Sequence, residues 1–188
     1  MRLASFGDKW VAASVLRNPR RSFLANPIGI LDSLRAFNRD AVIQVFDARY
    51  VVSVRQIHAA AVAAYLAFKA GTNISRKMEI ELLLRLAADT QIGRVLERLG
   101  VREGTEEVGL CILANERSSA VRIAEDLAKA VGGTEVDDDY LGREERLARA
   151  IEFYGIEMAE IESVQARDRA EAILILILER IATLDLKR

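Results

Sequence analysis

The strongest constraint on this fold is a helical pattern from Val54 to Lys69 that is apolar on almost every side. Such a helix lies inside a core, or half in a core and half under a partner. Ser53 and Gln56 predict its start as a capping box, in which each side chain accepts a hydrogen bond from the other residue's backbone N–H. The apolar residues occupy two separate faces of the helix: Ile57, Ala61, Ala64, Tyr65 and Phe68 on one, and Val62 and Leu66 on the other.

Two further helices follow in the segment that ends at Val101. The Gly71–Asn73 motif ends the first helix and supplies an N-cap for the second, at Thr72 or Asn73. Apolar residues at three-to-four spacing carry this second helix to about Ala88. A third runs from Gln91 and ends at Gly100.

The rest of the chain alternates short β-prone runs with helices. Together these patterns predict an α+β fold: a helix-dominated single domain, residues 1–188, with a small sheet of three to four strands. Residues 139–188 are expected to be its C-terminal helical segment, after a linker at Asp137–Asp139. The expected strands are 8–16, 42–46, 108–113 and 134–136. Another helix is expected to begin at Pro27, with Asn26 as its N-cap, and a further one to run from a cap at Asn115 or Ser118 to Lys129. The remaining expected helices begin at residues 143, 158 and 168.

Charge and cysteine content restrict the possible functions. The formal net charge is −1, which argues against a broad basic surface for nucleic acid, so any RNA contact must be a local patch. One cysteine permits no internal disulfide and fits a reducing cytoplasm. The longest apolar run, Ala172–Leu178, is too short to span a bilayer. We therefore expect a cytoplasmic protein with no membrane partner.

Few side chains are suited to catalysis. Cys111 falls inside an apolar strand, and His58 has no second histidine in the sequence to act with it. Glu135 with Asp137–Asp139 could bind a divalent ion, but the spacing of a calcium loop is missing. No phosphate-binding glycine loop of the Walker or Rossmann type is present. We expect no catalytic residues, no metal, no cofactor and no small-molecule substrate.

A small basic cluster predicts an anion site. Lys69 ends the first helix, and Arg76 and Lys77 are predicted in the first turn of the second. Cations there oppose the helix dipole, whereas an anion would meet free backbone N–H groups as well as the side chains. The alternative is a set of solvated surface cations.

Two more polar residues further along this segment have two readings each. Arg85 lies four residues after Glu81, so the two side chains either form a simple helical ion pair or hold the guanidinium ready for a phosphate. Gln91 both donates and accepts hydrogen bonds, which suits a helix start or the edge of a base.

The last predicted helix, like the one from Val54 to Lys69, is unusually apolar. Its Ile173–Leu178 run places apolar groups on every face. Either part of this helix is an exposed docking patch, or the helix is fully internal. The candidate docking residues are Ile173, Ile175, Ile177, Ile181 and Leu184.

The order of several short motifs resembles one known family. These are Gly71–Arg76 (GTNISR), Glu81–Leu83 (ELL), Gln91-Ile92, Leu99–Val101 (LGV) and Ile177–Leu186 (ILERIATLDL). Together they resemble the TPRKB family, the tRNA-binding and kinase-binding subunit of the KEOPS complex. Gln56 and Ala88 stand where that family usually has histidine and glycine, and His58 lies two residues from the first of these places.

The resemblance implies a non-catalytic subunit with two partners. It would dock on the small kinase-like ATPase of KEOPS through the apolar terminal helix and part of Val54–Phe68. It would also recruit tRNA by the 3′ CCA end, for synthesis of threonylcarbamoyladenosine. The tRNA-binding candidates are then Lys69, Asn73, Arg76, Lys77, Arg85 and Gln91.

Two other functions remain open at this level. The chain could be a purely structural activator of the kinase with no RNA contact. It could instead be a stand-alone enzyme that uses His58, Glu81 and the acidic residues at Asp137–Asp139.

Overall fold

The computed structural model describes residues 1–187 and divides into two compact units. The first unit comprises Met1–Ala48 and Leu96–Val136. The second comprises Arg49–Val95 and the chain from Asp137 onward. We describe each unit by itself.

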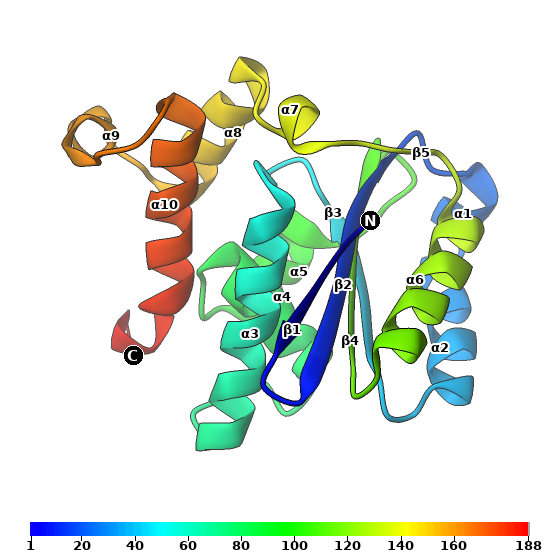
Figure 1. Ribbon diagram of the computed structural model, residues 1–188. Coiled ribbons are helices and arrows are strands. Elements are labelled where there is room, and N and C mark those ends of the chain that lie inside the picture. The colour runs from blue at the N-terminus through cyan, green and yellow to red at the C-terminus, as the bar shows by residue number, and fades with distance from the viewer. Residues whose placement is uncertain (188) are drawn as a thin grey trace. The chain divides into compact units, whose positions relative to one another are not determined.

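An antiparallel sheet forms the centre of the first unit (Figure 1). Its strand order is β1-β2-β4-β3, and β5 pairs with the end of β2 on the same edge as β1. The strands are β1 (Arg2–Phe6), β2 (Lys9–Arg17), β3 (Val42–Asp47), β4 (Glu107–Ala114) and β5 (Thr134–Glu135). The helices of this unit are α1 (Arg21–Ala25), α2 (Pro27–Phe37) and α6 (Arg117–Val131).

Every residue of β4 is buried, so this strand is the middle of the first unit's core. Gly109 is required there, because a Cβ would lie 2.1 Å from the ring of Phe46 on the neighbouring strand. Burial raises the pKa of the Cys111 thiol to about 12, which keeps it protonated and unreactive at neutral pH.

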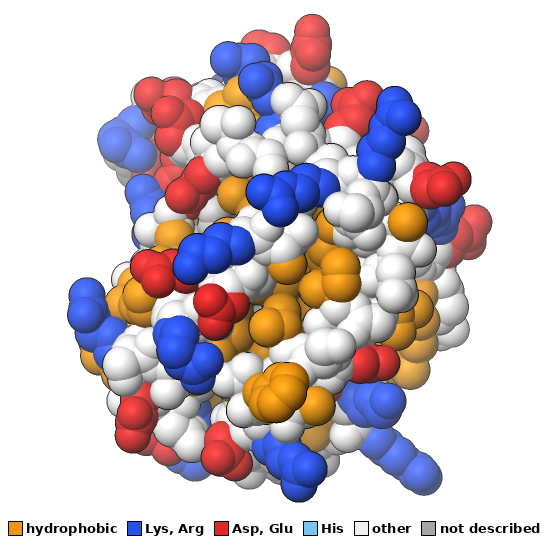
Figure 2. Space-filling view, turned by 90° about the vertical axis from the view of Figure 1, so that its right-hand side faces the viewer, with side chains coloured by type: hydrophobic (Ala, Val, Ile, Leu, Met, Phe, Trp, Pro, Cys, Tyr) orange, Lys and Arg blue, Asp and Glu red, His pale blue; other side chains and the backbone are white. Residues whose placement is uncertain are grey.

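One face of the sheet is covered by α2 and α6, whose apolar residues join those of β2, β3 and β4 in one cluster. Figure 2 views the side that carries these helices and shows hydrophobic side chains gathered near its middle, with charged groups around them. On α2, Ile28 and Phe37 are largely exposed.

The second unit is helical. Its helices are α3 (Val54–Ala70), α4 (Met78–Ala87), α7 (Asp138–Leu141), α8 (Glu144–Tyr154), α9 (Met158–Ser163), α10 (Arg169–Ala182) and the short 3₁₀ helix η1 (Leu184–Lys187). The remaining helix, α5 (Ile92–Leu99), begins in this unit and ends in the first. A core of α8, α9 and α10 residues is centred on Ile173 and Ile177, and Ala59 and Ala63 of α3 pack against it.

Two polar side chains connect these helices. Gln56 on α3 donates to the Tyr154 hydroxyl at 2.6 Å, and that hydroxyl donates to the Leu86 carbonyl at 2.5 Å, so α3, α8 and α4 are joined. Arg180 on α10 forms hydrogen bonds to both carboxylate oxygens of Glu160, at 3.0 and 2.9 Å, and reaches the carbonyl oxygen of Gly155.

The helix-dominated α+β fold predicted from the sequence is confirmed. The sheet has one strand more than expected, because β1 was not indicated, and the short helices α1 and α7 were also missed. The prediction of one domain over 1–188, with 139–188 as its C-terminal segment, stays a prediction. The predicted linker at Asp137–Asp139 is wrong, because Asp137 caps α7 and Asp138 lies in it.

Ser53 is the N-cap of α3 as predicted, but its capping box with Gln56 and the predicted caps of α4 and α6 are wrong. The Ser53 hydroxyl accepts a hydrogen bond from the backbone N–H of Arg55. The side-chain oxygen of Gln56, however, accepts from the backbone N–H of Val52 instead of that of Ser53. The Gln56 side chain is held in this direction because its NH₂ group donates to the Tyr154 hydroxyl. The N-cap of α4 is Lys77 rather than Thr72 or Asn73, and that of α6 is Glu116 rather than Asn115 or Ser118. The Asn26 cap of α2 is confirmed, since its side chain accepts from Gly29.

Ala88 ends α4 in the left-handed region, with φ 50° and ψ 38°. Alanine is strained there by about 1 kcal/mol, and glycine is not. We therefore expect Ala88→Gly to raise the free energy of unfolding in urea by about 1 kcal/mol. The matched change Ala87→Gly, one residue earlier and inside the helix, should lower it by about the same amount. A destabilising Ala88→Gly would contradict the backbone assignment.

Candidate functional site

An apolar groove runs between α3 and α10 in the second unit. It has a volume of about 480 Å³. Leu66, on α3, is 46% exposed, which is unusual for a leucine beside a packed core. Four alanines of α3 and Ala182 of α10 keep the groove open. The apolar lining residues are Ala59, Val62, Ala63, Leu66, Ala67 and Ala70 from α3, and Leu178, Ile181 and Ala182 from α10.

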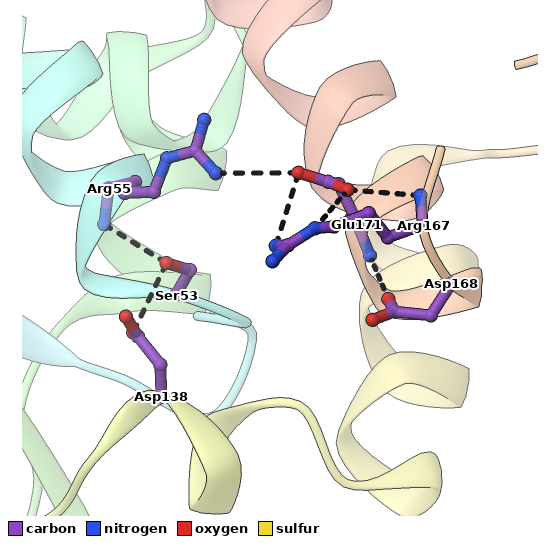
Figure 3. Close-up of polar contacts among 6 residues, drawn as sticks. All are labelled: Ser53, Arg55, Asp138, Arg167, Asp168 and Glu171. Atoms are coloured by element: carbon purple, nitrogen blue, oxygen red, sulfur yellow. Dashed lines mark hydrogen bonds and ion pairs between the residues drawn. The ribbon is translucent and has the colours of Figure 1, made fainter. Parts of the chain in front are cut away.

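Charged residues join the starts of these two helices (Figure 3). Arg55 on α3 lies 4.0 Å from the Glu171 carboxylate on α10, and Arg167 approaches the same carboxylate at 2.8 Å. The hydrogen bonds from Arg167, together with the attraction of Arg55, hold the pKa of Glu171 below its ordinary value. Asp138 accepts from the Ser53 hydroxyl at 3.1 Å and from the Val54 N–H, which ties the start of α3 to α7.

The groove lining also contains Arg85 and Asp185. The Arg85 guanidinium on α4 donates to Asp185 of η1 at 2.7 Å and to Glu81 at 2.9 Å. Arg85 is 1% exposed and Glu81 is fully buried. Burial alone would lower the pKa of Arg85, but the hydrogen bonds and attraction of Asp185 and Glu81 outweigh it and raise that pKa. The guanidinium therefore remains charged inside the fold.

The second oxygen of Glu81 holds the loop that precedes α4. It accepts from the backbone N–H of Ile74 at 2.8 Å and of Ser75 at 2.9 Å. Ser75 is itself buried, and its hydroxyl accepts from Lys77. One buried carboxylate thus fixes both the loop and Arg85.

A comparison with models of known protein families identifies the family of this chain. Residues 24–185 match the family described as kinase binding protein CGI-121. The chain belongs to this family. The resemblance to the TPRKB family drawn from its motifs is confirmed. A comparison with curated proteins gave no match.

The structure buries most of the predicted docking residues. Ile173, Ile177 and Ile181 lie in the core of the second unit, and Leu184 is also fully buried, so these four side chains are structural. Only Ile175 is exposed, at 36%. The groove residues Val62, Leu66 and Leu178 were not on the sequence-based list of docking residues. The signal was available on α3, because Val62 and Leu66 lie off the face that carries Ile57 and Ala61.

The predicted RNA residues are placed unequally. Lys69, Arg76, Lys77 and Gln91 are exposed, and Asn73 is half-buried with its amide on the Ser75 carbonyl. Arg85 is 1% exposed and its guanidinium donates to Glu81 and Asp185, which argues against its predicted role as an RNA contact. Arg76 and Lys77 precede α4 rather than standing in its first turn, which contains Glu79 and Glu81. Lys77 is the N-cap, still at the positive end of the helix dipole, so only the predicted placement in the first turn is wrong.

His58 and Glu81, two residues of the enzyme alternative, lie on different helices, α3 and α4. Both oxygens of Glu81 are occupied by Arg85 and the loop, and His58 is half-buried on α3. Within residues 1–187, no cluster of three or more histidine, cysteine or acidic side chains could bind a metal ion. No helix in that range is long and apolar enough to cross a membrane. The family describes a binding protein, which supports a binding subunit.

Proposed function

We propose that this protein is a non-catalytic subunit of the KEOPS complex, which binds the kinase-like ATPase subunit through the α3–α10 groove and recruits tRNA by its 3′ CCA end. The observation that carries the proposal is an open apolar groove on a chain of a kinase-binding family. The family description supports the kinase partner, and the tRNA partner rests on the resemblance and on the exposed cations beside one loop.

The groove has the form of a helix-binding site. Alanines at 59, 63, 67, 70 and 182 allow a partner backbone to approach closely, and Leu66 and Leu178 provide apolar contacts between them. Such a groove fits the apolar face of an amphipathic helix. Arg85 and Asp185 in the groove lining, together with Arg55 and Glu171 at the starts of α3 and α10, would fix the direction in which that helix lies.

The loop from Gly71 to Lys77 supports the RNA site. Lys69 precedes it, Arg76 and Lys77 follow its buried Ser75, and all three cations are exposed. Because Glu81 holds the loop amides, these cations project from a fixed backbone rather than a mobile one. A phosphate bound there gains charge attraction with little loss of loop entropy.

A charge placed in the groove should abolish kinase binding. Leu178→Glu and Leu66→Glu each put a carboxylate among the apolar side chains of the groove, so we expect affinity for the kinase subunit of the same organism to fall at least a hundredfold, by about 3 kcal/mol. Calorimetry measures this, and circular dichroism checks the fold. The control Met158→Glu changes another exposed apolar residue, on α9. Full binding by both groove variants would place the docking surface elsewhere.

Reversing the loop cations should weaken tRNA binding. The intact protein should bind CCA-ended tRNA with a slope of log affinity against log salt of about −2, near −0.7 for each of three phosphate contacts. Arg76→Glu with Lys77→Glu should lower affinity at least tenfold and flatten the slope. Arg117→Glu with Lys129→Glu makes the same charge change on α6 and should leave both unaltered.

Trimmed tRNA identifies the part of the RNA that is bound. Removal of the CCA end should reduce affinity for the intact protein as much as the double loop substitution does. Equal binding of trimmed and intact tRNA would overturn recognition of the CCA end. No saturable binding of either would favour the structural activator.

A further inference from the structure

A continuous line of charged contacts connects the groove to the loop. It starts at Asp185, which lines the groove, and passes through Arg85 at 2.7 Å to Glu81 at 2.9 Å. It ends at the amides of Ile74 and Ser75, at 2.8 and 2.9 Å. Every member belongs to the second unit.

The members of this line differ in their contact with water. Glu81 and Arg85 are already buried, so a partner in the groove cannot change their solvation much. The Asp185 side chain is 41% exposed, and it lines the groove beside Arg85. Its bond to Arg85 is therefore the one contact in the line that a docked partner would shield from solvent. Removal of water strengthens the attraction between two opposite charges.

We propose that kinase docking in the groove tightens RNA binding at the loop, with Asp185, Arg85 and Glu81 as the positioning residues that couple the two sites. The inference rests on the proposed function. A shielded Asp185 holds Arg85 more firmly, Arg85 holds the Glu81 carboxylate, and Glu81 holds the amides that precede Arg76 and Lys77. The loop then loses less conformational freedom when RNA binds.

The coupling acts in both directions and has a bounded size. If the kinase raises the affinity for RNA by some factor, RNA must raise the affinity for the kinase by the same factor. Coupling energies between protein sites usually correspond to about 5- to 150-fold. A line with one exposed contact belongs at the lower end, so we expect about fivefold to twentyfold.

The test is a four-way binding measurement. Affinity for fluorescent CCA-ended tRNA is measured with and without saturating kinase subunit, for the intact protein and for Asp185→Asn. The intact protein should bind tRNA at least fivefold more tightly with the kinase present. Asp185→Asn keeps the shape but removes the charge, and should reduce this factor to less than about twofold. The control Glu179→Gln removes an exposed charge from α10 and should leave the factor unchanged.

Hydrogen exchange supplies a second readout that does not depend on the variant. Kinase docking should slow exchange of the Ile74 and Ser75 amides in the intact protein. The coupling would be overturned if the kinase left the tRNA affinity of the intact protein unchanged, or if its effect on that affinity persisted in Asp185→Asn. Unaltered exchange of the Ile74 and Ser75 amides would also overturn it. These outcomes leave the proposed function standing if both partners bind. Failure to bind the kinase or tRNA at all would overturn both proposals.

Discussion

The buried carboxylate of Glu81 is the interaction on which the second unit depends. One oxygen accepts from the Arg85 guanidinium, and the other accepts from two loop amides. Burial of a charge is costly unless every oxygen finds a donor, and here each one does. The same contact fixes the start of α4, the loop before it and, through Arg85, the η1 turn after α10. Segments distant in sequence are thus held by contacts to one buried side chain and its Arg85 partner.

The two proposed binding surfaces, the α3–α10 groove and the loop cations, are separate, but the contacts of Glu81, Arg85 and Asp185 connect the residues that hold them in place. The groove between α3 and α10 is apolar because α10 has more apolar faces than its core can cover, and Leu178 is left partly exposed in the groove. The loop cations stand at the other end of the Glu81 contacts. A binding subunit needs surfaces that recognise two partners, and neither surface requires a nucleophile or a metal.

Sequence patterns predicted most of the helices and strands, because apolar periodicity reports which faces are buried. They also located α3 and α10 as the helices with surplus apolar surface. They failed at Gln56 and at the start of α4, where side chains bond to distant partners, Tyr154 and the loop amides, instead of forming local caps. Periodicity likewise could not separate the buried Ile173 and Ile177 from the exposed Ile175. That choice is set by packing against α3, α8 and α9, which no local pattern encodes.

The most direct test of this account is the free energy of unfolding of Glu81→Gln in urea. Glutamine keeps the shape and one acceptor but leaves the buried Arg85 charge without its internal partner, so we expect a loss of about 3 kcal/mol. Glu79→Gln, in the first turn of the same helix, should cost less than about 1 kcal/mol. A loss for Glu81→Gln no larger than that of Glu79→Gln would contradict the central place of the Glu81 carboxylate.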